Sequence, residues 1–135
     1  MPFLPTAPLA DAADVVLLLV RLVVGISFIY FGLPKIRDLR QNAESFVEMG
    51  FRPGMLWGTL IAVLEVFGGL AVIVGLLVWL VAAGLAVHMA TGTVWKITRT
   101  EKGFPDWSYD LLLLALALVL LAFGPGVYSV HALLV

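Results

Sequence analysis

Three ionisable residues interrupt long apolar stretches of this sequence: Arg21, Glu65 and His88. A charged side chain at the centre of a bilayer costs at least ~2.5–3.5 kcal/mol, so such residues usually face the interior of a helix bundle and pair there. We therefore predict a buried Arg21–Glu65 ion pair with His88 beside it. Histidine changes its charge near neutral pH, which suits a proton relay or a hydrogen bond to a quinone carbonyl. The alternative is a purely structural ion pair, with His88 as a simple link between helices.

A second polar pair is expected where the first and fourth apolar segments meet the membrane boundary. Lys35 and Asp110 both fall at that depth, so we predict that they pair. Small residues next to the charges let neighbouring helices approach and shield them. By the helical period, several glycines lie on the same helix face as Arg21 or Glu65, or next to that face. We expect close helix packing at Gly25, Gly32, Gly68 and Gly69.

The elements that carry these residues follow from composition. The 135 residues are 62% hydrophobic and 13% charged, and their mean hydropathy is +1.10. Soluble domains contain about 45–50% apolar and about 25% charged residues, so the bilayer is the expected solvent. A spanning helix needs roughly 20 mostly apolar residues. The apolar runs predict one domain with spans at 14–33, 55–75, 76–95 and 108–124.

The type of element follows from the continuity of these runs. Strands of a membrane barrel alternate apolar and polar residues, which these runs do not do. Inside hydrocarbon the remaining solution is the α-helix, whose backbone hydrogen bonds are internal. The sequence thus predicts an all-α integral membrane protein, a four-helix transmembrane bundle. Pro34 is expected to end the first helix, and Gly75 is the favoured break between the second and third helices.

Basic residues predict the orientation of the bundle. Seven of the eight lie in the segments 34–54 and 96–107, and Arg21 is the exception. The positive-inside rule places both segments in the cytoplasm and both termini on the other side. Residues 44–52 form either a short amphipathic surface piece or a plain loop. Residues 1–13 lack the basic start of a signal peptide, and we expect an irregular or interfacial segment there.

Several kinds of chemistry are excluded by residues that the sequence lacks. There are no cysteines, so disulfides, thiolate metal sites and dithiol redox chemistry are ruled out. His131 lies too far in depth from His88 for both to bind one haem iron. No metal-spaced set of ligands is present, and no basic stripe indicates nucleic acid. Any redox role would therefore depend on a non-covalent cofactor or on a partner subunit.

Short motifs resemble those of the DoxX family of small four-helix bacterial inner-membrane proteins. The pattern from Arg21 through Gly25 to Gly32 and Lys35 is similar to the family's first helix, and Glu65 with Gly68, Gly69 and Gly75 to its second. The Gly124-Pro125-Gly126 segment resembles the family's closing motif. Two positions depart from the family pattern: Asp110 replaces a glutamate and His131 replaces an aspartate.

The resemblance implies a role in membrane redox metabolism. Some DoxX relatives look like subunits of quinone-reducing membrane oxidoreductases, and others associate with oxidative-stress enzymes. The first hypothesis is a membrane subunit with a quinone or proton site near Arg21, Glu65 and His88, in contact with the lipid bilayer and other subunits. The second is an accessory subunit without chemistry, which stabilises a larger complex. The third is a permease for a small molecule or ion.

Overall fold

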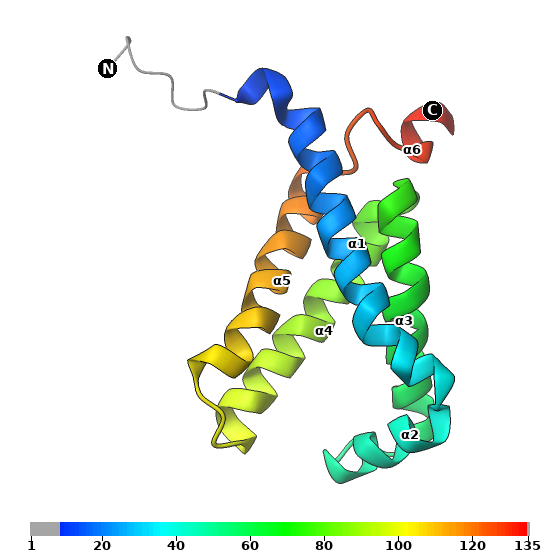
Figure 1. Ribbon diagram of the computed structural model, residues 1–135, viewed down its shortest axis with the longest axis vertical. Helices are drawn as coiled ribbons and strands as arrows, with labels where there is room; N and C mark the ends of the chain where they lie inside the picture. Colours follow the sequence, from blue (N-terminus) through cyan, green and yellow to red (C-terminus); the bar gives the residue numbers. More distant parts are fainter. Residues whose placement is uncertain (1–8, 135) are drawn as a thin grey trace.

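The computed structural model describes residues 9–134, and every regular element in that range is helical (Figure 1). Residues 1–8, which form most of the segment predicted to be irregular, lie outside the described residues. The described chain begins with a short 3-10 turn, Ala10–Ala12. The helices are α1 (Ala13–Arg37), α2 (Leu39–Glu48), α3 (Gly54–Val74), α4 (Val78–Arg99), α5 (Phe104–Phe123) and α6 (Val130–Leu134).

Four of these helices, α1, α3, α4 and α5, are long and apolar enough to cross a membrane. Their outer faces expose large apolar side chains, such as Ile26, Phe67, Val87 and Leu112. Exposed apolar surface of this extent requires lipid as its solvent. The prediction of an all-α multi-pass membrane bundle is confirmed.

The spanning helices form two pairs, α1 with α3 and α4 with α5. Figure 1 shows the pairs close together at the end that carries both described chain ends, and diverging toward the end that carries α2. We call these the terminal end and the basic end. Buried apolar side chains from all four helices fill the space toward the terminal end: Val24, Phe28, Val72, Val78, Ala82, Leu85, Ala86, Met89, Leu113, Ala117 and Leu120.

Glycines bring α1 and α3 into backbone contact. A Cβ atom at Gly69 would lie 2.7 Å from the carbonyl oxygen of Gly25, and one at Gly32 would lie 2.8 Å from the Glu65 Cβ. Both approaches are too close for any side chain. Gly68 faces the other way, toward Val81 of α4. The antiparallel register of α1 and α3 is thus set by positions without side chains.

A glycine also ends α3. Gly75 has a φ of +80°, and the Leu76 and Gly75 amides donate to the carbonyl oxygens of Ala71 and Val72 at 2.9 and 3.2 Å. This pair of bonds is the Schellman motif, which uses a left-handed residue to close a helix. The reversal between the second and third spans therefore needs no polar residue.

The first helix is longer than the sequence predicts. Pro34 lies inside α1, which continues to Arg37. A proline removes one backbone donor, and this loss in the last turn does not stop the helix. The extension keeps Lys35 helical and places it on the same stripe as Arg21 and Gly32.

The predicted loop 34–54 contains a further helix, α2. The Asp38 carboxylate caps its start by accepting from the Gln41 amide at 3.1 Å. Asn42 and Phe46 are buried against α3, and the Asn42 side chain donates to the Gly58 carbonyl at 2.8 Å. An amphipathic helix does form in this loop, but it begins and ends earlier than the segment 44–52.

Substitution at Gly69 tests the glycine contact. We expect Gly69→Ala to lower the free energy of unfolding by about 1–3 kcal/mol, because the new methyl group meets the backbone of α1. Gly92→Ala is the matched control in α4, where a Cβ would meet only the Asp110 Oδ2 atom, at 3.4 Å. The control should be neutral or slightly stabilising. Thermal unfolding in detergent measures both, and equal stability of the two variants would contradict the close contact.

Candidate ligand-binding site

Glu65, in the middle of α3, is the centre of a polar cluster. Its Oε1 atom accepts a hydrogen bond from the ammonium group of Lys35 and lies 3.0 Å from His88 Nε2. The Glu65 side chain is 2% exposed, whereas those of His88 and Lys35 are 18% and 30% exposed. A buried carboxylate is therefore paired with two partners that reach toward more open space.

Three helices position this cluster. Gly32 of α1 packs directly against Glu65, so α1 and α3 are close at this level and Lys35 follows one turn later. His88 comes from α4, across the space between the two helix pairs. We call Lys35, Glu65 and His88 the charged triad. It links both pairs at the depth where they begin to diverge.

The charged triad faces a cavity of about 1330 Å³ between the helix pairs. Most of the lining is apolar and aromatic, and the core residues Phe28, Met89 and Leu113 form its inner limit. Large apolar cavities with a few convergent polar groups are the usual form of small-molecule sites. The arrangement is suited to a mostly apolar ligand with one polar group.

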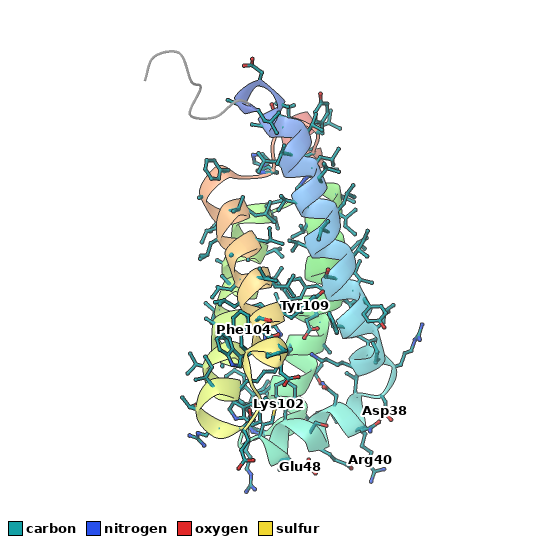
Figure 2. The ribbon with its side chains drawn as sticks, turned by 60° about the vertical axis from the view of Figure 1, so that its left-hand side comes forward. Asp38, Arg40, Glu48, Lys102, Phe104 and Tyr109 are labelled. Carbon is teal, nitrogen blue, oxygen red and sulfur yellow. The ribbon has the colours of Figure 1, made fainter. Side chains whose placement is uncertain are left out.

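A second ion pair lines the same cavity closer to the basic end. Lys96 Nζ lies 2.8 Å from Asp110 Oδ2. The predicted pairing of Lys35 with Asp110 is wrong, because Lys35 binds Glu65 instead. Lys96 was expected in a loop, but α4 continues to Arg99 and presents it to α5. Figure 2 shows charged side chains gathered at this end, including Lys102 and Arg40.

Arg21 does not belong to the charged triad. It is fully buried at the terminal end, where its guanidinium donates to the Tyr128 carbonyl, close to Gly75 and Ser129. The predicted Arg21–Glu65 pair is wrong because of the helix register. Arg21 precedes Gly32 by eleven residues, or ~16 Å along the helix, and Gly32 is the residue that meets Glu65.

The position of Arg21 indicates a structural role. It lies at the C-terminal end of α3, where the helix dipole favours a cation. It also holds the segment 124–129, whose Val127 amide donates to Asp14 of α1 at 3.1 Å. The His131 amide in turn donates to the Gly75 carbonyl at 3.1 Å. These bonds hold residues 127–131 against the N-terminal part of α1 and the C-terminal end of α3.

The inward position of Lys35 could have been found from the sequence. Arg21, Gly25, Phe28 and Gly32 form one stripe of the first helix, and Lys35 continues it fourteen residues after Arg21. A first helix that ends at Pro34, as the sequence predicts, does not include Lys35 in that stripe. Lys96 is the residue that directly follows the predicted third span, 76–95. Helix ends are defined only to within one or two residues, so the sequence is also consistent with a helical Lys96.

The ion pair can be tested by removing each charge in turn. Lys35→Met leaves a buried carboxylate with only His88, and we expect it to lower the free energy of unfolding by ~3 kcal/mol. Glu65→Met should cost less, because the long Lys35 side chain can extend toward the basic end. The double variant should regain most of the lost stability. Thermal unfolding in detergent measures all three, with Arg40→Met, whose side chain is 90% exposed, as the control. Additive losses in the double variant would contradict the pairing.

The role of Arg21 predicts a local effect. In Arg21→Met the Tyr128 carbonyl loses its donor, so amides in the segment 124–134 should exchange hydrogen faster, including that of His131. Hydrogen-exchange mass spectrometry of detergent-solubilised protein measures this, and Arg99→Met serves as the control at the opposite end. Unchanged exchange in this segment would show that Arg21 does not hold it.

Comparison with known proteins bears on this site. The family model for DoxX matches residues 16–98, more than half of the chain. The match contains Arg21 and the whole charged triad, and it ends before α5, so Asp110 and the Gly-Pro-Gly segment lie outside it. No curated protein and no solved structure matches the chain. With its four membrane-spanning helices and this match, the chain belongs to the DoxX family.

Proposed function

We propose that this protein binds the headgroup of a membrane quinone in the cavity between its helix pairs, as a subunit of a redox assembly in the bacterial inner membrane. The observation that carries the proposal is the charged triad at the edge of an apolar cavity in a membrane protein. A quinone has the matching chemistry, since it combines an apolar ring with two carbonyl oxygens that accept hydrogen bonds.

The residues present fit such a headgroup. Lys35 supplies ammonium donors and His88 a ring nitrogen, and both are more exposed than Glu65. The aromatic rings of Phe28, Phe31 and Tyr109 line the cavity and offer apolar surface for a planar ring. A bound quinone would supply two-electron, two-proton chemistry. The ammonium group of Lys35 would stabilise negative charge that develops on the bound ring.

The same residues would also transfer protons to and from the bound headgroup. His88 Nε2 lies within hydrogen-bond distance of Glu65 Oε1, so a proton could pass between the imidazole ring and the carboxylate. The Lys96–Asp110 pair lies in the same cavity toward the basic end. By the positive-inside rule we place the basic end in the cytoplasm, so protons would reach the charged triad from that side. Electrons would come from a partner redox protein or a non-covalent cofactor, because the chain has no cysteine for dithiol redox chemistry.

The shape of the interior supports binding more than permeation. The cavity occupies the half of the bundle toward the basic end, whereas the buried core fills the half toward the terminal end. In a purely accessory subunit, the charged triad would only hold the helices together. Measuring quinone retention distinguishes that role from ligand binding.

The test is quinone retention during gentle purification. The wild-type protein should carry quinone in its lipid extract, and Glu65→Gln should carry several-fold less, because Lys35 and His88 lose the partner that holds them in place. Glu48→Gln, at an exposed position of α2 outside the cavity lining, should retain the wild-type amount. Thermal unfolding of each variant separates lost binding from lost folding. Absence of quinone from the wild type, or equal retention in a folded Glu65→Gln protein, would overturn the proposal.

A further inference from the structure

Specific contacts border the cavity on three sides. The gap between α1 and α5 is bridged by Phe31 and Tyr109, whose rings meet edge to face with centroids 5.4 Å apart. Figure 2 shows Tyr109 on the side of α5 that lies toward α1. Toward the basic end, α2 runs beneath the cavity, and the Trp95 indole of α4 donates to the Met49 carbonyl at 3.3 Å. The core closes the terminal side.

The fourth side, between α3 and α4, is hollow. These helices approach each other near the turn, where a Cβ at Gly68 would lie 3.1 Å from Val81. On the basic side of this contact the two helices are bridged by the Glu65–His88 interaction, and the cavity lining continues onto their outer faces. Several of these lining residues are exposed to the surroundings of the bundle, including Leu60, Leu80 and Val87. The side chains along this groove are apolar: Leu60, Ile61, Leu64, Leu80, Ala83 and Val87.

The groove leads directly to the charged triad. Leu64 and Glu65 are neighbours on α3, and Val87 and His88 are neighbours on α4, so each helix carries one groove residue next to one polar residue. The groove lies within the membrane-spanning segments, where its surroundings are hydrocarbon. A ligand with its polar group at Glu65 and His88 would therefore have an apolar exit toward lipid between these two helices.

We propose that the gap between α3 and α4 is a lateral portal, and that the ligand is an amphipathic molecule whose hydrocarbon tail lies in this groove. This inference rests on the proposed function, because it assigns the tail of the ligand whose headgroup the charged triad binds. Gly84 is the narrow point of the portal. A Cβ there meets only the end of the flexible Leu64 side chain, at 3.3 Å, so the absence of a side chain keeps the groove open.

The experiment compares two probes on the purified protein: a tail-less dimethoxy-methyl-benzoquinone and the same ring with a decyl tail. Gly84→Leu places a branched side chain in the groove. We expect it to weaken binding of the decyl probe by roughly tenfold or more, the size of a typical steric overlap, and to leave the tail-less probe unaffected. Ala115→Leu introduces the same side chain at an exposed position of α5 outside the cavity lining and should change neither affinity.

The outcomes separate the two proposals. Binding of both probes to the wild type, with the decyl probe alone weakened in Gly84→Leu, supports the portal. Equal affinity of the decyl probe for Gly84→Leu and wild type would overturn the portal and leave the headgroup site standing. Loss of both probes in Gly84→Leu would also overturn it, since the groove would then not be specific to the tail. If neither probe binds the wild type, the proposed function fails first.

Discussion

A single buried carboxylate sets the conditions for the rest of this structure. Glu65 lies in the middle of a spanning helix with almost no exposed surface, and leaving its charge unpaired in that environment would cost several kcal/mol. Its two partners come from different helices, so the pairing fixes α1 and α4 relative to α3. Lys35 can reach it only because α1 continues through Pro34 and because Gly32 lets α1 approach. The charge and the close packing therefore depend on each other.

The bundle is tight at one end and open at the other. Toward the terminal end, glycine contacts and a dry apolar core bring the helix pairs together, and Arg21 fastens the last segment over them. Toward the basic end the helix pairs diverge, and the mostly apolar cavity lies between them. The cavity is the result of this divergence. Residues of α2 and the Phe31–Tyr109 contact border two of its sides.

Much of the fold could be predicted from the sequence, because hydropathy and helix length are local properties. The number of spans, the turn at Gly75 and the inward position of Glu65 all follow from runs and periods of residues. The ion pairs could not be predicted in the same way. Which charges meet depends on how neighbouring helices are aligned along their axes. In this protein the close contacts at Gly25, Gly32 and Gly69 set that alignment between α1 and α3. Arg21 and Glu65 share inward faces but lie at different depths.

Photolabelling would show whether the charged triad contacts the headgroup of a quinone. A quinone with a light-activated azide on its ring would be bound to the protein in membranes, irradiated and located by mass spectrometry. The account predicts labels on cavity-lining residues near Glu65 of α3 and His88 of α4, suppressed by excess unlabelled quinone. Labels spread over the lipid-facing side of α5, around Leu112 and Leu118, without suppression by the competitor would contradict it.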